Sequence, residues 1–193
     1  GQILGIPVCR MLNPDSALRA PVYDGAIYMN DIIPEDAPFG PERVIQESID
    51  DVRAGHTILK VKIGRSHQWM EHDAGLARDI EIVRGIHDAL PGTAIMVDAN
   101  DGYTLEDSIA FLEGIGDTEL YWFEEPFREE EEKNRALKTY LLKERPRTCI
   151  ADGESMTDIP LLRDLAQKKL LDVWQPDVCG YGFTKWRSLM KEI

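Results

Sequence analysis

Short apolar stretches alternate with amphipathic stretches along most of the chain. Continuous or period-two apolar patterns predict six strands, at residues 21–29, 56–63, 93–98, 121–125, 148–151 and 171–175. Apolar positions at helical spacing predict a short helix at residues 2–12 and then helices at residues 41–54, 69–89, 104–115, 129–144, 158–167 and from 183 onward. Each repeat of strand and helix takes roughly 20 to 35 residues, the length of a unit in a parallel sheet covered by helices. The pattern therefore predicts an α/β fold.

Polar residues at the strand ends distinguish two parallel-sheet architectures. An open doubly wound sheet binds its ligand at one crevice, whereas a barrel gathers residues from the carboxyl ends of many strands. Here polar residues end the second to the sixth predicted strands alike. We therefore predict a TIM-type (β/α) barrel with helices outside, in residues 21–193, preceded by a linker and short helix in residues 1–20. A full barrel has eight strands and about 250 residues, so we expect a barrel truncated to about six strands.

Composition and charge narrow the class of protein. The formal net charge is -13 and the lysines and arginines are scattered, which argues against a nucleic-acid partner. No stretch approaches the roughly 18 to 20 apolar residues of a membrane span, and the first residues lack the features of a signal peptide. Cys9, Cys149 and Cys179 lie far apart, which is typical of reduced thiols. We expect a soluble, cytoplasmic protein.

Two lysines share one face of the predicted second strand. The opposite face holds Leu59, Val61 and Ile63, which in a barrel must contact the helices. Lys60 and Lys62 then point into the barrel, where each ammonium group would lower the proton affinity of the other and make a lysine usable as a general base. An edge strand protected by solvated lysines is the alternative interpretation.

Three acidic residues end successive predicted strands, namely Asp98, Glu124 and Glu154. Because the carboxyl ends of barrel strands surround one mouth, we expect these side chains to converge. Three carboxylates without histidine or cysteine form a hard oxygen site that suits Mg²⁺. For any one of these acids, a helix cap or a loop position is the alternative interpretation.

Five short motifs, taken together, resemble those of a known family. They are LKVKI (59–63), VDAN (97–100), FEEP (123–126), ADGES (151–155) and QPD (175–177). In this order and spacing they resemble the enolase superfamily and, within it, the mandelate racemase subgroup, whose members carry a mandelate racemase/muconate lactonising enzyme-like C-terminal barrel. The resemblance covers roughly residue 21 to the end.

The resemblance implies roles for the residues at these motif positions. Asp98, Glu124 and Glu154 would be the ligands of Mg²⁺. Lys62 would be the base, and Lys60 would hold the substrate carboxylate or tune Lys62. These assignments are what the family pattern implies for the matching positions.

Further positions have expected roles, those of Asn100 and Asp177 by the same comparison and the others from their place in or beside a loop. Asn100 would contact the substrate or the surroundings of the metal. Tyr28, Asn30 and Asp31, in or beside the acidic loop at residues 30–40, are candidate substrate contacts, Tyr28 foremost. Asp177 corresponds to an aspartate that family members pair with a histidine after the seventh strand, which would lie beyond residue 193.

Side chains alternate between the two faces of a strand, so the two adjacent glutamates of YWFEEPF (121–127) are expected on opposite faces. Glu124 shares the inward face with Trp122, whereas Glu125 points with Tyr121 and Phe123. We therefore expect Glu125 to be a packing partner or an outer neighbour of the metal site.

Departures from the family pattern disfavour two branches of the family. The usual glycine pair after the sixth strand is replaced by Tyr181-Gly182-Phe183, and no lysine follows Asp177, which disfavours muconate-lactonising chemistry. The glucarate branch is disfavoured as well, because its third metal ligand is typically asparagine where this chain has Glu154.

The implied chemistry is Mg²⁺-dependent removal of the proton α to a carboxylate, through an enediolate. Our leading hypothesis is a hydro-lyase that dehydrates an acid sugar to a 2-keto-3-deoxy acid. Racemisation or epimerisation of a 2-hydroxy acid at the same site is one alternative. Another is a fragment or degenerate relative that is inactive alone, without the family's cap domain and last strands. The full-length protein is expected to be a homo-oligomer.

Overall fold

Six parallel strands form one sheet in the computed structural model, which describes residues 1–33, 40–154 and 158–191. The strands are β1 (Asp24–Ile27), β2 (Ile58–Lys62), β3 (Ala94–Asp98), β4 (Leu120–Glu124), β5 (Cys149–Asp152) and β6 (Val173–Trp174). Each strand pairs in parallel with the next one along the chain. This order lacks the reversal of a doubly wound sheet and is that of a barrel wall. The predicted α/β part-barrel is confirmed.

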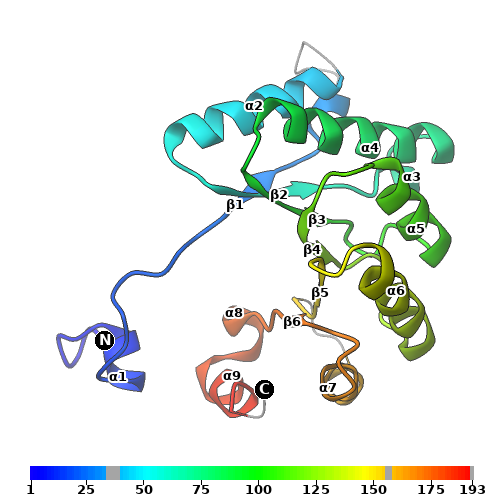
Figure 1. Ribbon diagram of the computed structural model, residues 1–193. Helices are drawn as coiled ribbons and strands as arrows, with labels where there is room; N and C mark the ends of the chain where they lie inside the picture. Colours follow the sequence, from blue (N-terminus) through cyan, green and yellow to red (C-terminus); the bar gives the residue numbers. More distant parts are fainter. Residues whose placement is uncertain (34–39, 155–157, 192–193) are drawn as a thin grey trace.

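Helices follow each strand and cover one face of the sheet. Figure 1 shows the five longest in an arc along the strands: α2 (Pro41–Ala54), α4 (His72–Ala89), α5 (Leu105–Gly114), α6 (Glu131–Glu144) and α7 (Ile159–Gln167). The shorter elements are α1 (Val8–Leu12), η1 (Asn30–Ile32), α3 (Arg65–Gln68), α8 (Val178–Tyr181) and α9 (Phe183–Leu189). In the described part of the chain, none of the helices has both the length and the apolar character required to cross a membrane.

The two faces of the sheet have different surroundings. Leu59 and Val61 of β2 and Phe123 of β4 are completely buried in the main core, against the helices. Burial of each such side chain contributes about 1.5–3 kcal/mol. Met96 and Trp122 lie on the opposite face in a separate small cluster. The predicted alternation is therefore confirmed: the apolar face of β2 packs on the helices and leaves its lysines on the inner face.

Local sequence signals fix several helix ends. Pro41 occupies the first turn of α2, and Gly55 ends that helix with a left-handed φ of 114°, a conformation that glycine adopts without strain. Thr104 and Asp107 form the predicted capping box at the start of α5, since each side chain bonds the backbone N–H of the other.

The predicted element limits differ from the observed ones at several places. The first helix begins at Val8 because Pro7 has an extended backbone. The predicted helix at 69–89 begins three residues later, as α4 at His72, and the short helix α3 that precedes it was not predicted. The Arg65 carbonyl accepts from both Trp69 and Met70 and closes α3. Glu71 then caps α4. The first and last strands are shorter than predicted. The division of the chain at residue 20 remains a prediction.

Candidate active site

The register of the sheet aligns the functional strand ends. Lys62 pairs with Asp98, Asp98 pairs with Glu124, and Glu124 pairs with Ala151. Beyond these pairs, backbone bonds continue across the mouth, from Ala99 N–H to the Glu124 carbonyl. The polar ends of β2 to β5 therefore meet at one edge, as the sequence predicted.

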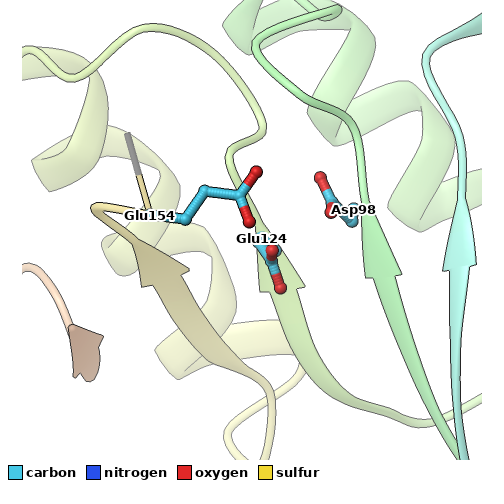
Figure 2. Close-up of side chains that lie close together, drawn as sticks. All are labelled: Asp98, Glu124 and Glu154. Carbon is cyan, nitrogen blue, oxygen red and sulfur yellow. The ribbon is translucent and has the colours of Figure 1, made fainter. Parts of the chain in front are cut away.

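Asp98, Glu124 and Glu154 come together at this edge, and we call them the carboxylate triad. One oxygen from each lies within 4.8 Å of the others. Figure 2 shows the three side chains directed toward a common point from β3, β4 and the end of β5. Asp98 and Glu124 have no solvent-exposed surface, whereas Glu154 is only partly buried. A donor set of three carboxylates, open on one side, fits a hard divalent cation such as Mg²⁺ with further oxygen ligands.

Two lysines contact the triad from β2. The Lys60 ammonium is 2.5 Å from Glu124 Oε1 and 3.0 Å from Asp98 Oδ2. The Lys62 ammonium is 2.5 Å from Asp98 Oδ2 and donates to Asn100 Oδ1 at 2.7 Å. Both lysines therefore face the inner side of the sheet, and the alternative of a solvated edge strand is wrong.

The prediction that the lysines lower each other's proton affinity is wrong for Lys60. Burial does favour its neutral form, but the charges of Asp98 and Glu124 outweigh burial, so the pKa of Lys60 is raised. The order of residues in the sequence does not show how close these carboxylates lie to the lysines. Lys60 is therefore a fixed cation beside the triad.

The two buried acids of the triad respond differently to this environment. Burial opposes ionisation of Asp98, but Lys60 and Lys62 hold its pKa below the usual range. Burial raises the pKa of Glu124, and the nearby charge of Asp98 adds to the effect. A divalent cation would offset the repulsion between these carboxylates, so the electrostatics also fit a metal site.

Glu125 and Asn100 surround the triad without being part of it. The Asn100 amide donates to Glu125 Oε2 at 3.1 Å and to Glu154 Oε1 at 3.3 Å, while its carbonyl oxygen accepts from Lys62. Glu125 has a left-handed φ of 39°, so the chain turns at once after β4. Burial raises the pKa of Glu125 to about 7. Asn100 thus links the lysine to the carboxylates.

A pocket of about 520 Å³ opens beside Lys62 and Asn100. Tyr28, one of the predicted substrate contacts, lines it together with Trp69. The structure therefore places Tyr28 in the same pocket as the candidate base, while its role remains a prediction.

Three predicted site residues have other partners. Asp31 is buried in an ion pair with Arg65, which occupies its carboxylate. Asn30 donates to Glu47 at 2.9 Å. Asp177 caps α8, since its carboxylate accepts from the backbone N–H of Cys179 and Gly180. Its pairing with a histidine remains a prediction.

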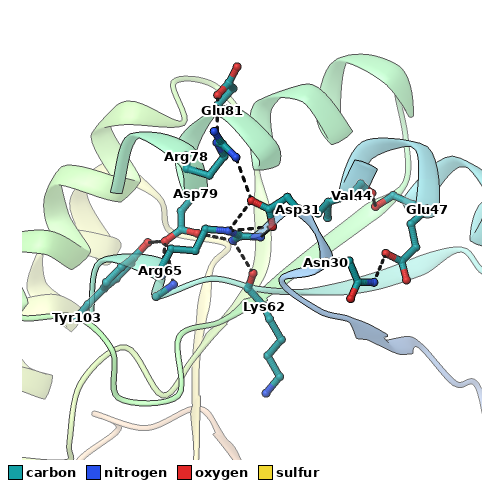
Figure 3. Close-up of polar contacts among 12 residues, drawn as sticks. Asn30, Asp31, Val44, Glu47, Lys62, Arg65, Arg78, Asp79, Glu81 and Tyr103 are labelled. Atoms are coloured by element: carbon teal, nitrogen blue, oxygen red, sulfur yellow. Dashed lines mark hydrogen bonds and ion pairs between the residues drawn. The ribbon is translucent and has the colours of Figure 1, made fainter. Parts of the chain in front are cut away.

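Sequence reasoning missed three residues near the site. Gln175 donates to Glu124 Oε2 at 3.1 Å, and its place at a strand end in QPD was an available signal. Arg65 is completely buried between Asp31 and Asp79 (Figure 3), although no local pattern distinguishes it from a surface arginine. Trp69 lines the pocket, whereas its place in the sequence indicates only the start of a helix.

Solved structures of a dehydratase share this fold. A galacturonate dehydratase variant from Geobacillus sp., complexed with Mg, is 33% identical with a TM-score of 0.84, over 94% of this chain and 47% of that chain. The same dehydratase complexed with D-galacturonate and 5-keto-4-deoxy-D-galacturonate gives a TM-score of 0.80 at 33% identity, over 89% of this chain and 46% of that one.

Curated relatives have several related activities. D-galactarolactone cycloisomerase of Agrobacterium fabrum is 27% identical over 66% of this chain and 31% of its own length. L-galactonate dehydratase of Hypocrea jecorina is 25% identical over 75% of this chain and 30% of its own length. Two epimerases of amino acids or dipeptides are 26% and 27% identical. The chain thus spans about a third of the length of these curated relatives.

The family model described as enolase C-terminal domain-like matches residues 44–191, which contain β2 to β6 and the whole triad. Together with the parallel part-barrel and the solved relatives, this match shows that the chain belongs to the enolase C-terminal domain-like family, among the mandelate racemase/muconate lactonizing enzymes.

Proposed function

We propose that the full-length protein binds Mg²⁺ at Asp98, Glu124 and Glu154 and removes the proton next to a substrate carboxylate. The observation that carries this proposal is the position of Lys62, which contacts the triad and lines the adjacent pocket. An acid whose carboxylate lies at the triad would therefore present its α-carbon to Lys62. Mg²⁺, when bound, would supply positive charge beside the substrate carboxylate.

Three side chains of the protein have separate roles in the reaction. Lys62, as its neutral amine, takes the α-proton, and the electrons of the broken C–H bond move into the carboxylate to give an enediolate. Lys60, a fixed ammonium group, stabilises the charge that develops there. Asn100 holds Lys62 through the 2.7 Å hydrogen bond. Lys62 is thus oriented before the substrate arrives.

Dehydration of an acid sugar is the reaction that we propose for this site. A hydroxyl group on the carbon next to the enediolate leaves, and the expelled hydroxyl and the abstracted proton together make one water. The resulting enol becomes a 2-keto-3-deoxy acid. Support comes from the relatives, which include galacturonate and L-galactonate dehydratases.

The test uses the full-length protein in D₂O with Mg²⁺ and a panel of uronic, aldonic and aldaric acids. We expect a keto acid from at least one of them, and loss of its formation when EDTA removes the metal. Lys62→Ala should lower turnover by about 10²–10⁴-fold, the usual contribution of a general base, with Mg²⁺ affinity retained in calorimetry. Absence of both keto acid and α-deuterium with every acid would defeat the proposal.

Lys168→Ala is the matched control for Lys62→Ala. Lys168 pairs on the surface with Glu131 and Asp164, and its side chain is 40% exposed. Its loss should leave turnover unchanged. If both lysine variants lost the same activity, Lys62 would have no special role.

Epimerisation is the second candidate, because two relatives are epimerases. It begins with the same proton removal and ends with a proton returned to the other face. The deuterium experiment distinguishes the two reactions: incorporation with inversion and no keto acid indicates epimerisation.

A further inference from the structure

The pocket beside Lys62 has a polar end and an apolar wall. Lys62 and Asn100 lie at the polar end, where Asn100 also contacts Glu154 of the triad. The wall consists of Tyr28, Ile32, Ile33 and Trp69, with Met29 and Asn30 between them. A substrate held at the triad by its carboxylate would therefore extend its remaining atoms along this wall.

We propose that Trp69 and Tyr28 select a hexuronic acid in its closed ring form over an open-chain acid sugar. This inference rests on the proposed function, since it places the substrate carboxylate at the triad. Trp69 is 59% exposed and Tyr28 is 55% exposed, so both have aromatic surface available for contact. They are specificity residues, and neither takes part in proton removal.

The wall offers few hydrogen-bond partners to a polyhydroxylated chain. The Asn30 amide already donates to Glu47. The exposed lining of the pocket is mostly apolar. An open-chain aldonic or aldaric acid carries a hydroxyl group on each inner carbon, and several of these would lose water without replacement. A pyranose ring instead presents a face of C–H bonds, which can pack on an aromatic ring.

A buried ionic network holds the wall in place (Figure 3). Arg65 is completely buried, and its guanidinium group is 2.5 Å from Asp31 and 2.5 Å from Asp79. Asp31 lies in η1, between wall residues Asn30 and Ile32. Arg65 is the first residue of α3, and its backbone carbonyl accepts a hydrogen bond from the N–H of Trp69. The same arginine therefore fixes both sides of the wall.

Arg65 also connects the wall to the candidate base. Its Nη1 donates to the backbone carbonyl of Lys62 at 3.1 Å. The distance between the wall and Lys62 is thus set by the buried network, so the pocket is formed before the substrate binds. A preformed wall can discriminate between substrates by shape.

Two acids with the same atoms around the carboxylate test ring recognition. D-galacturonate closes to a pyranose, whereas L-galactonate, its product of reduction at the aldehyde carbon, stays open. Methyl α-D-galacturonoside is locked in the ring form. We would measure the affinity of the full-length protein with Mg²⁺ for each acid by calorimetry, and α-proton exchange in D₂O by NMR.

The expected result is tighter binding of both ring acids than of L-galactonate, by about tenfold or more. Trp69→Ala should weaken binding of the ring acids by about tenfold and change binding of L-galactonate by less than about threefold. Trp69→Phe should restore most of the preference. Tyr28→Ala should act in the same direction, and Tyr28→Phe should resemble the wild type.

Tyr121→Ala is the matched control, because Tyr121 is 56% exposed and lines a different pocket, with His87 and Arg147. It should leave all three affinities unchanged. Equal binding of D-galacturonate and L-galactonate would overturn the inference. The inference would also be overturned if Trp69→Ala weakened the binding of all three acids equally. That result is expected if another part of the protein covers this tryptophan.

Binding and α-proton exchange together separate a failure of this inference from a failure of the proposed function. Ring acids that bind in a Trp69-dependent manner without exchanging the α-proton would uphold ring recognition and defeat the catalytic proposal. Proton exchange with no preference for ring acids would do the reverse.

Discussion

Adjacent residues at the end of β4 have different surroundings. Glu124 is completely buried, lies in the triad and accepts from Lys60 and Gln175. Glu125 lies outside the triad, and its carboxylate accepts from Asn100. Strand alternation predicted this division, and the left-handed turn at Glu125 completes it.

We expect unequal effects of Glu124→Gln and Glu125→Gln in the full-length protein. Glu124→Gln removes a charged ligand, so it should abolish Mg²⁺-dependent turnover and weaken Mg²⁺ affinity by about tenfold or more. Glu125→Gln leaves the triad complete, so Mg²⁺ affinity should stay within about threefold of the wild type. Calorimetry with Mg²⁺ measures both affinities, and an equal loss in the two variants would contradict the assignment.

The sequence predicted on which face these side chains lie, but it did not predict the protonation of Lys60. Alternation along β2 to β4 placed Lys60, Lys62, Asp98 and Glu124 on the inner face, because the period of a strand is independent of tertiary contacts. The protonation of Lys60 could not be read in this way. It depends on two carboxylates that come from other strands and lie within 3.0 Å of its ammonium group.

At the scale of elements, the starts of α4 and α5 are joined by one histidine. His72, the first residue of α4, is 2.9 Å from Asp73 and 3.0 Å from Asp107 of the α5 capping box. The hydrogen bond to Asp73 and the charge of Asp107 raise the pKa of His72. Two helix starts that are each capped locally are thus also linked to each other.

This link should make stability depend on pH. The pKa of His72 is raised in the folded state, so its contribution is fully present below its unfolded pKa of about 6.5 and is lost as pH rises through the folded value. We expect His72→Gln to lower the Tm most at about pH 5.5 and to have a smaller effect at about pH 8.5.

High salt provides the control for His72→Gln, because the histidine side chain is 54% exposed and about 1 M NaCl screens such pairs. The difference in Tm at low pH should shrink accordingly. An effect of the substitution that is the same at both pH values would show that the charge of His72 is irrelevant.

Element limits were predicted well where the signal is local. Pro41, Gly55 and the Thr104–Asp107 box were visible in the sequence, because each acts within one helical turn. The short helix α3 was missed. It depends on the Arg65 carbonyl, and the place of Arg65 is fixed by partners outside the helix.

At the scale of the whole molecule, one buried arginine joins segments that are far apart in sequence. Arg65 bonds Asp31, 34 residues before it, and Asp79, 14 residues after it. Tyr103 also donates to Asp79 at 2.7 Å. No periodic pattern relates these positions, so the sequence could not predict the network, although it predicted the barrel that contains it.

We expect Arg65→Gln to be strongly destabilising in the full-length protein. Without the guanidinium group, two buried carboxylates lose their main cation, which should cost about 3–5 kcal/mol of unfolding free energy. Arg65→Lys should cost less, because it keeps the charge and loses the bidentate geometry. Arg78→Gln is the matched control: Arg78 also pairs with Asp31, at 3.2 Å, but its side chain is 24% exposed, so about 1 kcal/mol is expected. Urea unfolding with Mg²⁺ and with EDTA measures all three, and equal losses for Arg65→Gln and Arg78→Gln would show that burial of the pair does not set its importance.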